Sequence, residues 1–130
     1  MGTMSDAEKN KCLDAHVGRT TFTANAGFWV KLHIGSPGAA GTTNPAGETT
    51  RKQVTFGSAA SAGAISNTAA VQWTNVSTAE TYSHVSFWDA STAGNFLGAD
   101  DLPATKTVAV GDTFTIPTGD LDLTATGTLP

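Results

Sequence analysis

The densest group of potentially catalytic residues lies at residues 83–98, where the sequence is SHVSFWDASTAGNFLG. His84, Ser86 and Asp89 are the residue types of a nucleophilic triad, in which a carboxylate orients a histidine that activates a serine. Along an extended strand, His84 and Ser86 lie on one face about 7 Å apart, too far for a direct hydrogen bond. The chain also lacks the GxSxG turn that exposes a nucleophilic serine. We therefore predict a strand, a turn opened by Asp89, and a second strand here.

Two further groups of polar residues have types that bind metals or cleave glycosidic bonds. The three histidines follow none of the spacings of known zinc or calcium sites, whether combined with Asp89 or with the later aspartates. Five aspartates toward the C-terminus lie close to glycine or proline, where aspartate stabilises turns. The histidines are His16, His33 and His84, and the aspartates are Asp100, Asp101, Asp112, Asp120 and Asp122. The sequence predicts no catalytic residue, no metal site and no cofactor.

Composition and charge exclude several classes of partner. The 130 residues are 14% charged, well below the roughly 25% of an average domain, and carry a net charge of −4. The seven lysines and arginines are scattered, which argues against nucleic-acid binding. The single cysteine, Cys12, excludes an intramolecular disulfide. The N-terminal 17 residues lack an apolar signal core and no stretch is long enough to span a membrane, so we expect cytoplasmic synthesis and no membrane contact.

The first segment has the pattern of a helix over residues 5–17. Ser5 followed by Glu8 forms a capping-box pattern, and Gly18 can end the helix. Leu13 and Val17 are four residues apart, so we expect them to face the core, with Cys12 buried beside Leu13.

After Gly18 the hydrophobic period changes to two, and short segments rich in Thr, Val and aromatic residues alternate with turn residues. This pattern predicts one domain over residues 1–130: an all-β antiparallel sandwich, immunoglobulin-like or jelly-roll-like. Residues 35–50 have the composition of a long exposed loop. The predicted strands cover residues 28–34, 53–56, 64–66, 69–73, 81–88, 96–97, 106–110, 112–116 and 121–125, and residues 53–56 can form a hairpin with 64–73.

Alternation within the strands separates a predicted core from a predicted outer face. The expected core residues are Phe28, Val30, Leu32, Ile34, Val54, Phe56, Ile65, Val71, Trp73, Val85, Phe87, Leu97, Val108, Phe114 and either Leu121 or Leu123. The opposite face of residues 81–88 carries Tyr82, His84, Ser86 and Trp88. Exposed aromatic rings stack on sugars, so Trp29, Trp88 and Tyr82 also raise the possibility of glycan binding.

The order of several blocks resembles a family of small virion proteins of tailed bacteriophages, labelled tail-fibre-like or minor structural proteins. The blocks are the N-terminal helix, FWVKLHIGSP, RKQVTFG, AISNTAAVQW, SHVSFWDASTAGNFLG and LPATKTVAVGDTFTIPTGDLDLTATG, covering residues 5–127. The resemblance implies a virion component made in the host bacterial cytoplasm, with no enzyme activity and no cofactor.

Two positions on a virion fit this resemblance. The absence of heptads or repeats for a fibre shaft favours decoration of the head over a tail-fibre or minor tail role. A carbohydrate-binding module for attachment to a bacterial surface is the third alternative. The expected partners are the major capsid protein or tail proteins, and the chain can form a homotrimer. The expected interface residues are Tyr82, His84, Trp88, Trp29, Pro37, Asn44 and Pro45.

Overall fold

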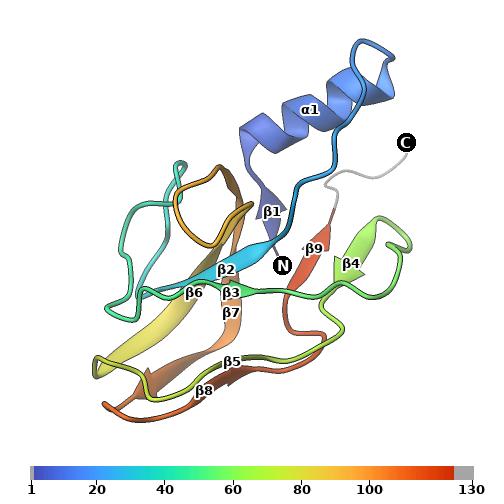
Figure 1. Ribbon diagram of the computed structural model, residues 1–130. Coiled ribbons are helices and arrows are strands. Elements are labelled where there is room, and N and C mark those ends of the chain that lie inside the picture. The colour runs from blue at the N-terminus through green and yellow to red at the C-terminus, as the bar shows by residue number, and fades with distance from the viewer. Residues whose placement is uncertain (1, 125–130) are drawn as a thin grey trace.

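A computed structural model describes residues 2–124 (Figure 1). The elements are β1 (Thr3–Met4), α1 (Asp6–His16), β2 (Trp29–His33), β3 (Lys52–Gln53), β4 (Ala64–Ser66), β5 (Val71–Trp73), β6 (Glu80–Trp88), β7 (Phe96–Val108), β8 (Phe114–Ile116) and β9 (Asp122–Thr124). One sheet has the order β1-β7-β6-β2-β3, and two short pairs, β4-β9 and β5-β8, complete the fold. Every pairing between these strands is antiparallel.

The core lies between the large sheet and the β5-β8 pair, so the predicted antiparallel sandwich is confirmed (Figure 1). Tyr82 from β6 and Phe114 from β8 meet with their ring centroids 5.0 Å apart, and Phe114 also packs on Trp73 of β5 at 5.8 Å. On β2, Val30 and Leu32 are fully buried, as their alternation predicts. These side chains form one hydrophobic cluster.

The predicted hairpin between residues 53–56 and 64–73 is wrong. β3 pairs with β2, β4 pairs with β9 and β5 pairs with β8. None of these three strands pairs with the strand next to it across the turn at residues 57–63, as the turn residues had suggested. The last predicted strand corresponds to β9, and residue 125 lies outside the described residues.

The prediction that Tyr82 lies on the outer face of residues 81–88 is wrong, because its side chain is fully buried in the core. The pairing of β6 with β7 changes register between Tyr82 and His84. A bulge of this kind shifts the alternation by one position, so Tyr82 lies on the same side as Val85 and Phe87. Ile34 is also misassigned, since it is 49% exposed one residue beyond the end of β2.

The helix forms where predicted, with the Oγ atom of Ser5 accepting a hydrogen bond from the backbone N–H of Glu8. Its inward side differs from the prediction. Glu8 is buried, Cys12 is half-buried, and Leu13 and Val17 point to solvent. The carboxylate of Glu8 accepts hydrogen bonds from Lys11 and Asn25, which compensates for its burial.

β1 connects this helix to the large sheet. Thr3 and Met4 pair with Ala99 and Gly98 of β7, and the backbone N–H of Ser5 donates to the carbonyl of Leu97. A side chain at position 98 would overlap the carbonyl oxygen of Thr3, so the close approach requires glycine. Beyond this connection, the helix lies above the strand layers and has few contacts with them (Figure 1).

Candidate functional site

A serine–histidine pair does form, but the histidine is His33 of β2. Its Nε2 atom lies 2.7 Å from the Oγ atom of Ser86, and its Nδ1 atom lies 2.8 Å from the carbonyl oxygen of Thr43. The indole Nε1–H of Trp88 donates to the same Ser86 oxygen over 2.8 Å. His84 bonds instead to its neighbour Ser83 over 2.8 Å. The predicted absence of a His84–Ser86 contact agrees with this geometry.

The chemistry of the partners determines where the protons lie in this cluster. The indole nitrogen of Trp88 can only donate, and the carbonyl of Thr43 can only accept. His33 therefore carries its proton on Nδ1, and its Nε2 accepts the hydroxyl proton of Ser86. Every hydrogen-bonding group in the chain from Trp88 to Thr43 is then satisfied with His33 neutral.

Burial determines what this cluster can do. Ser86 and His33 have no exposed surface, so a substrate has no access to the serine oxygen in this structure. Burial is the main factor that holds the pKa of His33 below its usual value, against a smaller opposite effect of the Thr43 carbonyl. The hydrogen bonds of His33, Ser86, Trp88 and Thr43 thus join β2, β6 and the loop over residues 35–50. We call this group the polar clamp.

Most of the loop over residues 35–50 is exposed, as predicted, but its second half lies along the edge of β2. The backbone N–H of Ile34 donates to Asn44, and that of Ala46 donates to Leu32. The carboxylate of Glu80 accepts the N–H groups of Gly47 and Glu48. The loop residues Pro37, Gly41, Ala46 and Glu48 are buried as a result. The loop thus supplies the layer that encloses His33 and Ser86.

Trp88 is enclosed by a second clamp and is only 8% exposed. The guanidinium carbon of Arg51 lies 4.1 Å from the centre of the Trp88 ring, a cation–π contact. Arg51 also donates to the carbonyls of Ala90 and Ala93 in the turn after β6. The turn is closed by Asp89, whose carboxylate accepts both the backbone and the side-chain N–H of Asn95. The predicted turn at residues 89–95 is confirmed.

The residues expected at an interface fall into three groups. Tyr82, Trp88 and Pro37 are buried in this chain, His84 and Trp29 are half-buried, and Asn44 and Pro45 are exposed. Trp29, Trp88 and Tyr82 do not form a shared exposed platform for a sugar, because Tyr82 faces the core and Arg51 lies over Trp88. Among the seven, only the loop residues Asn44 and Pro45 are exposed.

The remaining polar groups take structural positions. Asp112 accepts the backbone N–H of Ala109 in the turn before β8, as predicted. The turn prediction is wrong for Asp100 and Asp101, which lie within β7 and pair with β6, and for Asp122, which lies in β9. Within residues 2–124, no group of three or more His, Cys, Asp and Glu side chains is placed to hold a metal ion. No helix in the described part of the chain is long and apolar enough to cross a membrane.

The sequence pattern did not predict that large apolar side chains would be exposed on α1 and in the segment after it. Leu13 is 61% exposed and Val17 is 67% exposed, and Phe22 in the segment after α1 is 42% exposed. The helix has little amphipathic contrast, so its sequence offered no strong signal for which side turns inward. Exposed apolar side chains can take part in contact surfaces.

These features define a small structural β-sandwich. The buried contacts of His33 with Ser86 and of Arg51 with Trp88 hold its strands and loops together. The chain belongs to the family described as Podophage GP4 fiber I protein gp80, whose model matches residues 3–124. It is therefore a virion structural protein of the tailed-phage, tail-fibre-like type, as the resemblance of its sequence blocks predicts. No curated protein matches the chain.

Proposed function

We propose that this chain is a fibre component of a short-tailed phage particle and that α1 attaches it to a neighbouring virion protein. The family description supports the fibre assignment over the capsid decoration that the sequence pattern favours. The structural observation that carries the attachment is the exposure of Leu13 and Val17 on a helix that stands above the sandwich (Figure 1).

The two sides of α1 have different roles in this proposal. Glu8 anchors the inner side through Asn25, and β1 anchors the start of the helix to β7. Leu13 and Val17 lie four residues apart, so they form neighbouring contacts on the outer side. An isolated helix of this length is marginal in water, and covering its apolar side by a partner stabilises it. Asn44 and Pro45 are proposed as a second, smaller contact because both are exposed.

Antibody labelling of intact particles tests the fibre assignment. An antibody against this chain, visualised by electron microscopy, should bind at the tail fibres. Label distributed over the head surface would overturn the fibre assignment and support the capsid decoration role instead. The label position is independent of how the chain attaches.

A matched pair of valines tests the attachment through α1. Val17 and Val110 are both 67% exposed, and Val110 lies in the turn between β7 and β8. Val17→Ser should reduce the amount of this protein in purified particles, while Val110→Ser should leave it unchanged. Equal incorporation of both variants, with unchanged thermal unfolding of the purified proteins, would contradict the proposed role of α1.

A further inference from the structure

β8 is an edge strand at the end of the molecule remote from α1. Trp73 lies opposite Phe114 and Val71 lies opposite Ile116, so β5 pairs with the whole length of β8. Within residues 2–124, no strand pairs with its other edge. An unpaired edge presents backbone N–H and C=O groups that can take up a further strand.

An apolar groove of about 250 Å³ runs beside this open edge. One wall is residues 113–117, and the other is the part of β7 at residues 102–106. β7 separates from β6 there, because the pairing passes from Tyr82 opposite Lys106 directly to His84 opposite Asp101. The lining includes Leu102, Pro103, Phe114 and Ile116, and the proline has no N–H to offer to another strand. The groove thus offers backbone pairing along the β8 side and apolar contact along both walls.

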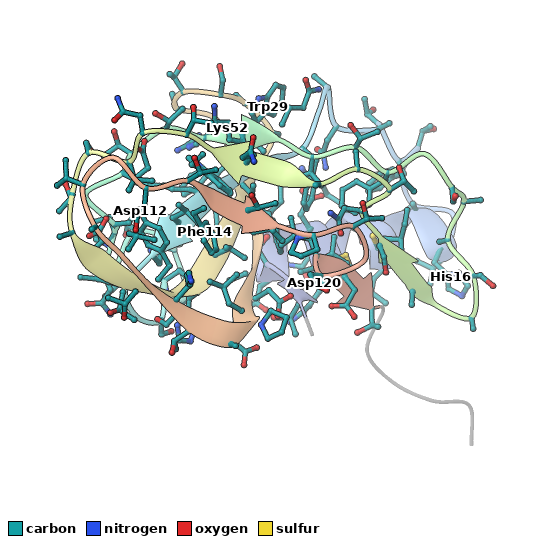
Figure 2. All side chains as sticks on the ribbon, turned by 90° about the horizontal axis from the view of Figure 1, so that it is seen from below. His16, Trp29, Lys52, Asp112, Phe114 and Asp120 are labelled. Carbon is teal, nitrogen blue, oxygen red and sulfur yellow. The ribbon has the colours of Figure 1, made fainter. Side chains whose placement is uncertain are left out.

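One end of the groove is acidic. A second hollow of about 290 Å³ shares Leu102, Pro103 and Asp120 with the first, and it is also lined by Asp100, Asp101 and Asp122. Figure 2 shows Phe114 on β8 and Asp120 in the turn after it. Asp120 lies where the two hollows meet, Asp122 lines the second hollow, and Lys106 lines the first. The best occupant is therefore an extended segment with an apolar middle and a cation at its Asp120 end.

The chain itself contains a segment with this chemistry. Residues 19–24, RTTFTA, follow α1, are exposed at every position and have no strand or helix assignment. Threonine and phenylalanine favour strands, and Phe22 is 42% exposed. The side chain of Arg19, at the start of the segment, forms an ion pair with the partly exposed Asp14 at 3.3 Å. A surface pair of this kind is worth little, so Arg19 can exchange its partner at low cost.

We propose that residues 19–24 of one copy add as an antiparallel strand to the open edge of β8 in a second copy. Phe22 then occupies the groove beside Phe114, and Arg19 lies next to Asp120. The donor segment, which follows α1, and β8 lie at opposite ends of the molecule (Figure 1). Such a contact uses two different surfaces and generates an open column or a ring of copies. These contacts join copies of the chain wherever in the particle the copies reside.

Sedimentation velocity of the purified full-length protein over a concentration series tests this contact. The wild type should form species larger than a dimer. Phe22→Ser and Asp120→Arg should each weaken association by about tenfold or more, as expected for a buried anchor and a paired charge. Val110→Ser is the control, because Val110 is more exposed than Phe22 and lies outside the proposed contact. Circular dichroism establishes that each variant is folded.

Mixing two variants tests the direction of the contact. The Phe22→Ser protein keeps a working groove, and the Asp120→Arg protein keeps a working segment, so the mixture should form a 1:1 dimer that does not grow. The double variant R19E/D120R should regain association through the reversed ion pair.

Three results would overturn the proposal. The first is a wild-type protein that stays monomeric up to its solubility limit. The second is a loss of association in Val110→Ser equal to that in Phe22→Ser. The third is a photo-crosslinker at Thr115 that captures a different virion protein in assembled particles.

Discussion

The Nε2 atom of His33 lies 2.7 Å from the Oγ atom of Ser86, although 53 positions separate the two residues in the sequence. β2 and β6 are neighbours in the large sheet, and this hydrogen bond links their outer face to the loop through Thr43. Ser86 is the centre of the clamp, since its oxygen bonds to both His33 and Trp88.

Ser86→Ala should destabilise the fold by about 1–3 kcal/mol, because it leaves the buried nitrogens of His33 and Trp88 without their partner. Ser83→Ala is the matched control, since Ser83 also bonds to a histidine but is only half-buried. Urea unfolding of the two variants measures the difference. Equal losses of unfolding free energy would show that the clamp adds nothing beyond an ordinary surface hydrogen bond.

The stability of the protein should fall as the pH drops below about 6.5. Burial holds the pKa of His33 in the folded chain below the usual 6.5, so the unfolded chain binds this proton at the higher pH. The resulting stability is fully present above the unfolded pKa and is lost as the pH falls toward the folded one. Lys31 and His84 add to this effect, because both disfavour a positive charge on His33.

Urea midpoints measured between pH 8 and pH 5 test the His33 assignment, and His33→Gln is the comparison. This variant has no titrating group at position 33, so its midpoint should change less across that range than the midpoint of the wild type. An unchanged slope in His33→Gln would assign the pH dependence to other groups.

Asn67→Asp should cost about 2 kcal/mol or more at neutral pH. Asn67 is buried, its Oδ1 atom accepts the N–H groups of Gly119 and Leu121, and its Nδ2 atom donates to the carbonyls of Ala69 and Pro117. Aspartate keeps the shape but directs a carboxylate oxygen at two carbonyl oxygens. Thermal unfolding measures the loss, with Asn10→Asp on the exposed side of α1 as the control. A loss no larger than that of the control would contradict the buried network.

Arg51→Lys should loosen the turn after β6 even though the charge is kept. Arg51 stacks on Trp88 and reaches the carbonyls of Ala90 and Ala93, and a lysine cannot reproduce the planar stacking together with both hydrogen bonds. Hydrogen exchange of residues 89–95 should accelerate, with a loss of stability of about 1 kcal/mol. Lys52→Arg is the control, because Lys52 is next in the chain and makes none of these contacts. Unchanged exchange in Arg51→Lys would mean that Asp89 and Asn95 hold the turn without it.

Features that depend on neighbouring residues followed from the sequence alone. Ser5 and Glu8 predicted the start of α1, and the alternation of residues 28–34 placed Val30 and Leu32 in the core. The turn at residues 89–95 was equally clear from its composition. The cap and the turn depend on hydrogen bonds that span three and six positions, and the alternation of β2 depends only on the pleat of a strand, so local chemistry is sufficient.

Features that depend on remote partners were decided only by the tertiary structure. A register change against β7 turns Tyr82 inward, which strict alternation along β6 could not predict. The loop over residues 35–50 encloses His33 and Ser86 because its hydrogen bonds reach β2 and β6. The exposed side of α1 likewise depends on Asn25, which binds Glu8 from 17 positions away. A sequence pattern determines which residues can be buried, whereas the partners that meet across the fold determine which of them are buried.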